Sequence, residues 1–507
     1  MSSRRWMAAG LIGISMGVLG FALAGPEPTD QPTVTTVGYT APAPTTMTAP
    51  PVDTTTTTAA PTPTTTPPVV PGVGEPFGVT TGLTMFRGNH SRTWYGTGPL
   101  PADPVSVLWR YPDAPMCGSS VVGGESRVWC GTGWTGQPVV WERPDGVTEV
   151  IFGAYDKSVH FVDAATGDPT REPFPTGDII KGSVSLDPHG YPLLYTGSRD
   201  NRLRILALDR EPVEELWSLE ASAVAGRWND DWDGNPLIDD GILFEGGENS
   251  WFFAIELNRG RDENDLVTVD PRIVFQMPGW TDELIARVGN NVSIESSVVK
   301  AGDRVYFANS GGRIVGLDVS RVRQGEAPVV FDYWAGDDID ATLVADADGM
   351  LYAAIELERR TERSEDVGQL IKLDPFTTSD PLVWAVSVPA IGPGDGGIWA
   401  TPAIALGHVY VTTHPGELLT VDAMTGEVTD RHDVGFHSWS SPVVVDGDLL
   451  VATCETAELR RYSLADPAHP QLDWAVTSAE GCLESTPAVW NGTIYVGSRD
   501  GYVRAYR

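Results

Sequence analysis

The stretch Val305-Tyr-Phe-Ala-Asn-Ser-Gly-Gly-Arg-Ile-Val-Gly-Leu-Asp318 decides the fold of this chain, because similar stretches recur along it. A second clear copy is Ile494-Tyr-Val-Gly-Ser-Arg-Asp-Gly-Tyr-Val-Arg-Ala-Tyr506. In each copy two runs of β-forming residues flank a turn of Gly, Asp or Ser, which is the pattern of a β-hairpin. Eight copies follow one another between Val150 and Arg507. They lie about 45–60 residues apart, a period typical of propellers and solenoids.

Each repeat is expected to supply four strands, and the innermost strand follows the pattern Ser-Ser-Pro-Val-Val seen at 440–444. We expect the first inner strand at 119–122, where the sequence is Ser-Ser-Val-Val. The last repeat reaches Arg507 after three strands, whereas an extra strand is predicted at 105–111, ahead of the first repeat. Pairing of this strand with the last repeat closes a ring and removes two exposed sheet edges. The sequence therefore predicts an all-β fold, an eight-bladed β-propeller closed by an N-terminal strand.

The repeat resembles that of a known family at three points. These are the strand pair Tyr-Val-Gly-Ser-x-Asp-Gly, the corner Asp-Ala-x-Thr-Gly at 163–167 and 422–426, and an aromatic residue in the last strand. Over about 105–507 the chain is similar to the quinoprotein-type, or PQQ-like, β-propeller. The family includes PQQ-dependent alcohol dehydrogenases and outer-membrane assembly scaffolds, so the resemblance implies a fold but no single function. A subgroup of exported actinobacterial proteins of this class is also similar in segments 227–236, 244–251 and 292–297.

The first 24 residues have the features of an export signal. Arg4 and Arg5 precede an apolar run at 7–24 that ends in Ala22-Leu-Ala24, a small-x-small cleavage pattern. The run also has the length needed to span a bilayer. A cleaved signal peptide and an uncleaved single-pass membrane anchor therefore both remain open for 1–24. Either one places the rest of the chain outside the cytoplasm, secreted or attached to the cell membrane.

Residues 25–76 consist mainly of Thr, Pro and Ala, including five consecutive threonines at 54–58. Such a segment buries too little apolar surface to offset the entropy of ordering, so it is predicted to be a disordered linker. The predicted domains are thus a signal or anchor at 1–24, the linker at 25–76 and the propeller at 77–507.

The charge of the chain restricts its partners. Its 68 acidic and 34 basic residues give a net charge of −34. An acidic protein repels nucleic acids and anionic lipids, so neither is expected as a partner. The charge is compatible with solubility alone and also with recruitment of cations.

The four cysteines of an exported chain are expected to form disulfides. Cys117 and Cys130 fall opposite each other across the turn at 123–124, which predicts a bridge between the first two strands of blade one. Cys454 and Cys482 fall on the same rim of blades seven and eight, which predicts a bridge between neighbouring blades.

One position of the repeat is occupied mainly by charged and aromatic residues, which are candidates for binding a ligand. It lies two residues before the second Ser or Thr of each inner strand and is expected to face the mouth of the central channel. Its occupants include four carboxylates, one lysine and two tryptophans; in chain order they are Gly118, Lys181, Asp233, Glu295, Asp340, Trp399, Trp439 and Glu484. Aromatic walls with a few charges are typical of small-molecule sites, and clustered carboxylates suit a hard cation such as Ca²⁺. A polar ligand or cation site and a water-filled structural channel both remain open.

A second calcium signal overlaps this set. Asn229, Asp231, Asp233, Gly234 and Asp240 fit positions 1, 3, 5, 6 and 12 of the acidic calcium loop. The final Glu of that motif and its flanking helices are missing. The alternative is an acidic blade entrance with Asx turns.

The sequence favours an exported module of the cell envelope that binds or scaffolds without catalysis. Its expected partner is a protein or a small polar ligand, and the chain is expected to be a monomer. It contains neither an adjacent Cys-Cys pair nor a Cys-x-x-Cys-His motif, which argues against a stacked quinone and against covalent haem. The alternative is a PQQ- or metal-dependent oxidoreductase or hydrolase that uses the same mouth, with Asp233, Glu295 and Glu484 around a metal.

Overall fold

The computed structural model describes residues 70–507 except 123–124, 134–135, 378, 392–395 and 478. The predicted signal or anchor and most of the predicted linker lie outside the described residues. Among the described residues, no helix has both the length and the apolar character required to cross a membrane. Residues 70–76 fall within the predicted linker but contact the propeller, because the Val70 amide donates to the Ala347 carbonyl at 2.8 Å and the Val70 side chain is buried.

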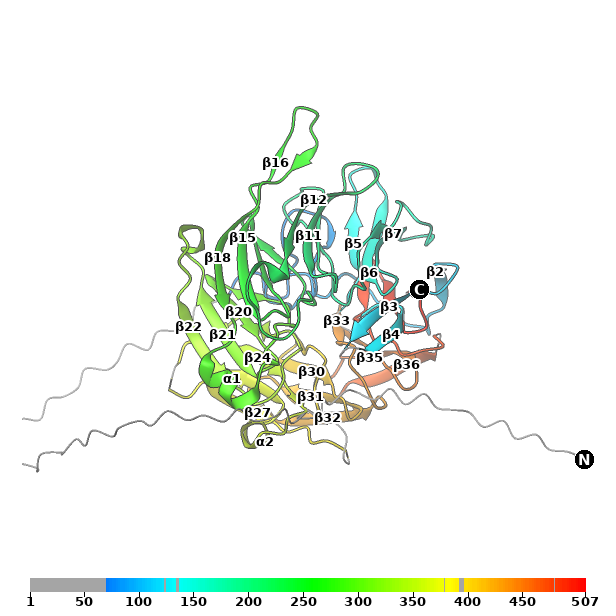
Figure 1. Cartoon of the computed structure of the whole chain (residues 1–507). Coiled ribbons are helices and arrows are strands. Elements are labelled where there is room, and N and C mark those ends of the chain that lie inside the picture. Colours follow the sequence, from blue (N-terminus) through cyan, green and yellow to red (C-terminus); the bar gives the residue numbers. More distant parts are fainter. Residues whose placement is uncertain (1–69, 123–124, 134–135, 378, 392–395, 478) are drawn as a thin grey trace, which may run out of the picture. The chain divides into compact units, whose positions relative to one another are not determined.

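Eight antiparallel sheets confirm the predicted propeller, and they follow one another around a centre in chain order (Figure 1). Blades one to four consist of β5 (Val139–Glu142), β6 (Thr148–Ala154), β7 (Ser158–Asp163) and β8 (Phe174–Pro175); β9 (Ser185–Leu186), β10 (Leu193–Thr196), β11 (Arg202–Ala207) and β12 (Glu214–Glu220); β13 (Leu237–Asp239), β14 (Ile242–Gly246), β15 (Trp251–Glu256) and β18 (Arg272–Pro278); and β19 (Val299–Ala301), β20 (Arg304–Ala308), β21 (Arg313–Asp318) and β22 (Val329–Trp334).

Blades five to eight repeat the arrangement. They consist of β23 (Val344–Ala345), β24 (Leu351–Ala354), β26 (Leu370–Leu373) and β27 (Leu382–Val386); β29 (Ala403–Ala405), β30 (His408–Thr412), β31 (Glu417–Asp422) and β32 (Val428–Asp433); β33 (Val443–Val445), β34 (Asp448–Ala452), β35 (Glu458–Ser463) and β36 (Gln471–Thr477); and β37 (Ala488–Trp490), β38 (Thr493–Gly497), β39 (Val503–Tyr506) and β2 (Val107–Tyr111).

The remaining elements lie outside the four-stranded pattern, and one of them, β1 (Gly82–Leu83), adds a fifth strand to blade one by pairing with β5. They are β1 (Gly82–Leu83), β3 (Cys117–Val122), β4 (Glu125–Cys130), β16 (Gly260–Arg261), β17 (Val267–Thr268), β25 (Glu356–Leu357), β28 (Gly396–Gly397), α1 (Asp282–Val288), α2 (Glu362–Val367) and 3₁₀ turns at Ala221–Ala223 and Val322–Gln324.

Strand β2 closes the ring as predicted. It pairs antiparallel with β39, so that Trp109 lies opposite Ala505 and Tyr111 opposite Val503. The buried core lies between adjacent blades, since every large apolar cluster combines side chains of neighbouring sheets. Closure therefore gives the first and last blades the same two-sided burial as the others.

The repeated corner Asp-Ala-x-Thr-Gly serves as a seat for the tryptophan of a neighbouring blade. The indole N–H of Trp109 donates to the Ala164 carbonyl at 3.0 Å, and that of Trp384 donates to the Ala423 carbonyl at 3.1 Å. The glycine that ends each corner has a positive φ and lies against the indole ring. The aromatic last strand and the corner, which the sequence shows as separate signals, are thus two halves of one contact.

The Ser and Thr residues of the inner strands also have a common role. The Ser297 amide donates to the Thr342 hydroxyl, the Thr342 amide to the Thr401 hydroxyl, and the Thr401 amide to the Ser441 hydroxyl, at 2.9–3.1 Å. The inner strands are therefore joined from blade to blade by a belt of hydrogen bonds around the channel.

Blade one departs from the prediction. The segment 119–122, expected to be its inner strand, belongs to β3, which pairs only with β4 in a separate two-stranded sheet. The inner strand of blade one is β5, which follows Gln137-Pro138. Its sequence has Gln137 where the other repeats have Ser or Thr, except for Asn235 in blade three, and this explains why the pattern selected the earlier Ser-Ser-Val-Val.

Both predicted disulfides are present. Cys117 and Cys130 face each other across the β3–β4 hairpin, so this bridge lies outside blade one rather than within it. Cys454 follows β34 of blade seven and Cys482 precedes β37 of blade eight, so the second bridge joins neighbouring blades as expected.

The segment 84–95 fills the centre of the ring, a feature that the sequence analysis missed. The Arg87 guanidinium donates to the carbonyls of Pro402 and Pro442 in blades six and seven. The Arg92 guanidinium donates to Asn235 of blade three and, at 2.7 Å, to the Val298 carbonyl of blade four. Both arginines are fully buried. The channel is therefore closed by backbone-directed hydrogen bonds from the N-terminal part of the propeller.

Candidate functional site

The repeat position singled out by the sequence lies at one end of the inner strands, and its residues meet there. Seven of the eight predicted residues directly precede the inner strands of blades two to eight: Lys181, Asp233, Glu295, Asp340, Trp399, Trp439 and Glu484. The eighth, Gly118, lies on β3 opposite Trp129 and does not belong to this set. The equivalent of blade one is residue 135, which lies outside the described residues. We refer to the surface formed by the seven residues as the mouth.

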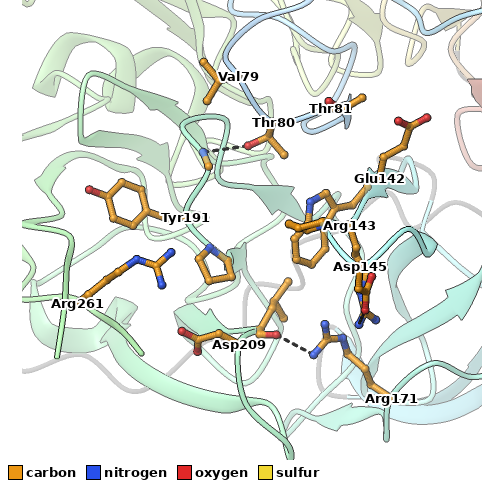
Figure 2. Close-up of a pocket in the computed structure, with 15 residues that line it drawn as sticks. Val79, Thr80, Thr81, Glu142, Arg143, Asp145, Arg171, Tyr191, Asp209 and Arg261 are labelled. Carbon is orange, nitrogen blue, oxygen red and sulfur yellow. Dashed lines mark hydrogen bonds and ion pairs between the residues drawn. The ribbon is translucent and has the colours of Figure 1, made fainter. Parts of the chain in front are cut away.

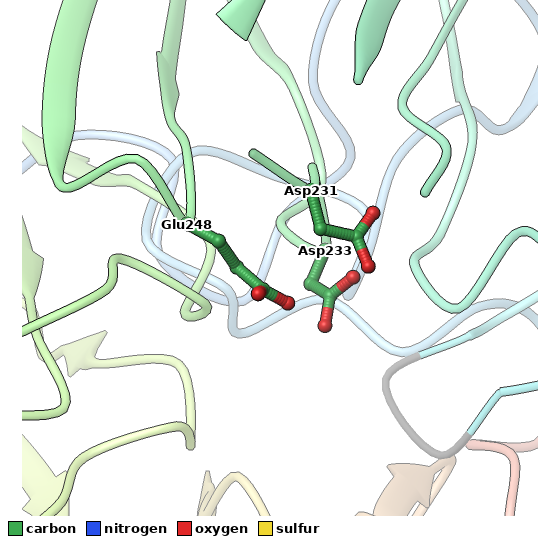
Figure 3. A group of neighbouring side chains, drawn as sticks. All are labelled: Asp231, Asp233 and Glu248. Carbon is green, nitrogen blue, oxygen red and sulfur yellow. The ribbon is translucent and has the colours of Figure 1, made fainter. Parts of the chain in front are cut away.

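One side of the mouth is a group of paired charges. The Lys181 ammonium forms an ion pair with Asp233 and donates to Glu248 at 3.0 Å, and it lies 3.6 Å from Asp231. Arg199 adds an ion pair to Asp231 at 3.2 Å. Figure 3 shows the three carboxylates directed toward one another. This side of the mouth therefore carries three acids with two bases set among them.

Burial and charge act against each other in this group. Burial raises the pKa of Asp233 well above its usual range, although Lys181 opposes the shift. Burial would lower the pKa of Lys181, but Asp233, Glu248 and Asp231 outweigh it and hold that pKa well above normal. Lys181 is therefore a permanent cation at the mouth.

The next side of the mouth is acidic. The Ser293 hydroxyl donates to Glu295 at 2.8 Å, and the Ser310 hydroxyl donates to Asp340 at 3.2 Å. Burial, followed by the charge of Asp340, raises the pKa of Glu295 well above its usual range. Burial, followed by the charge of Asp338, raises that of Asp340 in the same way. These side chains are only partly covered, so a ligand can reach them.

The side of the mouth opposite the paired charges is aromatic. Trp399 and Trp439 stack with their ring centres 5.4 Å apart, and His437 stacks on Trp439 at 3.7 Å. The indole N–H of Trp439 donates to Nδ1 of His414 at 2.8 Å. Burial, with a contribution from His437, lowers the pKa of His414 to about 4, so this ring is neutral at pH 7 and its nitrogen accepts. The aromatic wall is therefore held in one orientation by stacking and by a hydrogen bond.

Glu484 completes the circle between the aromatic wall and Lys181. It lies 3.4 Å from His437 and 3.2 Å from Arg499. Burial opposes ionisation, but Arg499 and His437 outweigh it and hold the pKa of Glu484 below its usual range. Glu484 is thus an ionised carboxylate that is already paired.

The floor of the mouth is Phe86, from the segment that fills the ring. Phe86 lines a cavity of about 10 Å³ together with Glu295, Asp340 and the hydroxyl-bearing residues Ser297, Thr342, Thr401 and Ser441. A space of this size holds no more than about one water molecule. The mouth is therefore a blind pocket rather than the open end of a through channel.

Comparisons with known proteins support the fold. Residues 367–507 match the family model described as outer membrane protein assembly factor BamB. BamB from Moraxella catarrhalis is 16% identical with a TM-score of 0.51, covering 80% of this chain and 98% of that chain. Quinohemoprotein alcohol dehydrogenase from Comamonas testosteroni is 13% identical with a TM-score of 0.53, covering 84% and 80%. The computationally designed Ika8 protein is 11% identical with a TM-score of 0.51, covering 73% and 95%.

This chain has the fold of an eight-bladed β-propeller. No curated protein matches its sequence. Identities this low show the fold alone, and BamB and the alcohol dehydrogenase have different roles. The evidence for the function of this propeller therefore lies in its mouth.

The aromatic wall of the mouth has no gap between its rings for a quinone. Trp399 and Trp439 stack on each other and His437 covers Trp439, so these stacked rings leave no slot between them for a flat cofactor. The cavity beneath holds about 10 Å³, far less than a tricyclic ring system requires. All four cysteines are bound in disulfides. Neither bridge joins adjacent cysteines, so the described residues offer a quinone no slot in the aromatic wall and no adjacent cysteine pair to stack on.

The structure brings two residues of the predicted calcium loop, Asp231 and Asp233, together with Glu248, and it places Asp240 elsewhere. Asn229 donates to Glu248 at 2.7 Å, and Asp231 and Asp233 face Lys181. Asp240 lies beyond the far end of β13, where its exposed carboxylate pairs with Arg323 at 2.8 Å. The metal set of the enzymatic alternative is also divided among other partners, since Asp233 pairs with Lys181, Glu295 with Ser293 and Glu484 with Arg499.

Some residues of the mouth were not predicted from the sequence. Glu248, Arg199 and His437 lie in connections between strands, outside the repeat position that was aligned. Each is fixed by a charge or ring contact to a predicted residue. Only Glu248 carried a sequence signal, because it lies within the segment 244–251 singled out for its resemblance.

A larger groove lies away from the mouth, near the far ends of β5 and β9 (Figure 2). It encloses about 670 Å³ between blades one and two, and its charges are mixed. Arg143 pairs with Asp145, and Arg171 pairs with Glu149 at 3.0 Å. The groove therefore has room for a ligand, but its arginines already have carboxylate partners.

Proposed function

We propose that this protein is an extracytoplasmic, non-enzymatic binding or scaffolding module of the cell envelope, and that its mouth binds a small polar ligand with a positive charge. The observation that carries the proposal is the blind mouth, in which an aromatic wall adjoins a carboxylate wall above Phe86. An aromatic face attracts a cation, and a carboxylate beside it strengthens the attraction. Pockets of this composition are typical of small-molecule sites.

Two further observations support the proposed location and the proposed scaffolding role. The two disulfides favour an oxidising compartment outside the cytoplasm. The match of 367–507 to a family described as an outer membrane protein assembly factor supports a role that involves protein partners.

The proposal is tested by thermal melting of the full-length protein with choline and glucosamine as cationic probes and glucose as a neutral control. A ligand that binds only the folded state raises the melting temperature. We expect the cationic probes to raise it, and the variant Trp439→Ala to lose most of this rise. Trp228→Ala is the matched control, because Trp228 is 51% exposed and is not one of the mouth residues.

The competing outcomes are distinct. Equal shifts with glucose and glucosamine, or no shift with any probe, would contradict a cation-binding mouth. Chemical conversion of a probe, followed by NMR, would instead favour the enzymatic alternative.

A further inference from the structure

A second group of carboxylates lies beside the mouth in blade five, formed by Asp338, Glu356 and Glu358. One carboxylate oxygen from each lies within 4.8 Å of the others. The backbone holds them together, because the Glu356 amide donates to the Asp338 carbonyl at 2.9 Å. Glu356 begins β25, and Glu358 directly follows that strand.

Two of these carboxylates are buried without full hydrogen bonding. Glu356 is 1% exposed and its Oε1 has no hydrogen-bond partner among the described residues. Asp338 is 4% exposed; its Oδ2 pairs with Arg359 at 3.3 Å, whereas Oδ1 has no hydrogen-bond partner in the described part of the chain. A buried carboxylate oxygen is normally satisfied by a donor or a metal, so these two atoms point to a missing partner.

The neighbouring Asp337 shows what a satisfied carboxylate looks like in the same loop. Its two oxygens accept from the amides of Arg359 and Arg360 at 3.1 and 2.8 Å, and from the Ser364 hydroxyl at 3.2 Å. It holds the loop in place and has no capacity left for an ion. The unsatisfied atoms are therefore confined to the neighbouring side chains.

Charge balance separates this group from the similar one around Lys181. Asp231, Asp233 and Glu248 have Lys181 and Arg199 among them, so the place of a cation is taken by protein groups. Around Glu356 the excess is acidic. Burial and the charges of Asp340, Asp338 and Glu358 all act to raise its pKa well above the usual range.

We propose that Asp338, Glu356 and Glu358 bind one Ca²⁺ ion. The ligands are all oxygens, as hard cations require, and Ca²⁺ bonds oxygen at about 2.3–2.6 Å. Oxygens on opposite sides of such an ion are therefore about 4.8 Å apart, so one ion can contact all three carboxylates at their present spacing. Mg²⁺ demands near-ideal octahedral geometry and usually retains several waters, so a set of three protein carboxylates suits Ca²⁺ better.

The ion would tie two structural units together. Glu356 begins β25, which pairs with β28 ahead of the inner strand of blade six, whereas Asp338 lies in the loop before β23 of blade five. Bound Ca²⁺ would therefore fix the boundary between the acidic and aromatic sides of the mouth. The site does not depend on the ligand proposed above.

Calorimetric titration of the full-length, EDTA-treated protein with CaCl₂ tests this site, together with melting in Ca²⁺ and in EDTA. We expect one high-affinity site, a higher melting temperature in Ca²⁺, and a smaller effect of Mg²⁺. Glu356→Gln should weaken Ca²⁺ binding at least tenfold. In EDTA this variant should melt at or above the wild-type temperature, because it removes a repelled carboxylate; that result would show that it folds.

Asp231→Asn is the matched control, since it removes a carboxylate from the group that Lys181 and Arg199 already neutralise. It should leave Ca²⁺ affinity unchanged. Absence of Ca²⁺ binding to the wild-type protein, equal binding by Glu356→Gln, or loss of binding in Asp231→Asn would each overturn the assignment.

Discussion

At Gly426 the backbone φ is +77°, and a Cβ there would lie 2.7 Å from the indole of Trp384. Two independent reasons thus favour glycine at this corner: the left-handed backbone and the close approach of the ring. Gly407, in the same blade, has the same φ of +77° but no atom within 4 Å of its Cβ position. A comparison of Gly426 with Gly407 therefore distinguishes the effect of the left-handed backbone from that of the contact with the ring.

We predict that Gly426→Ala destabilises the protein more than Gly407→Ala does. Both variants incur the cost of a left-handed alanine, and only Gly426→Ala also displaces Trp384, which adds about 1–3 kcal/mol. The free energies of unfolding from guanidinium titration give the comparison. Equal losses in the free energy of unfolding would mean that the Trp384 indole can move away from the new methyl group without cost.

At the scale of elements, the loop before β23 carries a group that makes the stability of the protein depend on pH. Burial, opposed by Arg359 and assisted by Glu358, raises the pKa of Asp338 to about 7. The unfolded value is about 3.9. Between these two values the folded state binds a proton that the unfolded state releases, so this group's contribution to stability falls as pH rises through the interval.

We predict that Asp338→Asn gains stability relative to the wild type as pH rises from 5 to 8 in EDTA, because the variant no longer has the titrating group. The difference between the two melting temperatures, measured at each pH in matched buffers, checks this. A difference that stays constant with pH, or shrinks toward pH 8, would show that Asp338 is ionised throughout the range.

Most of the fold could be predicted because the evidence for it is local and repeated. Ser-Ser-Pro-Val-Val marks inner strands, and the orphan strand at 105–111 requires a partner, which β39 provides. The mouth residues before the inner strands followed from the same register. Blade one was misplaced because Gln137 replaces the hydroxyl that the pattern requires. Glu248 and Phe86 escaped prediction because their positions depend on how distant segments pack, which no local pattern records.

At the scale of the whole molecule, one of the two disulfides joins blades of the ring and the other does not. Cys454–Cys482 joins blades seven and eight beside the closing sheet, whereas Cys117–Cys130 lies in a hairpin that is a sheet of its own. A bridge stabilises by restricting the unfolded chain, but only when its loop unfolds together with the rest.

We predict that replacing Cys454 and Cys482 by serine lowers the free energy of unfolding by about 3–4 kcal/mol, as expected for a loop of this length. Replacing Cys117 and Cys130 should cost less, because the hairpin can open while the blades stay folded. Guanidinium unfolding of both double variants provides the measurement. Equal losses would show that the hairpin unfolds together with the ring.

The plugged centre also has a mechanical consequence. Residues 84–95 are bonded to blades three, four, six and seven, and they precede β2 in the chain. A pulling force applied at the N-terminus is therefore distributed over several blades before it reaches the strand that closes the ring. Residues 84–95, held by Arg87 and Arg92, would carry this force first. The pairing of β2 with β39, which closes the ring, would therefore not be the first contact to break under tension.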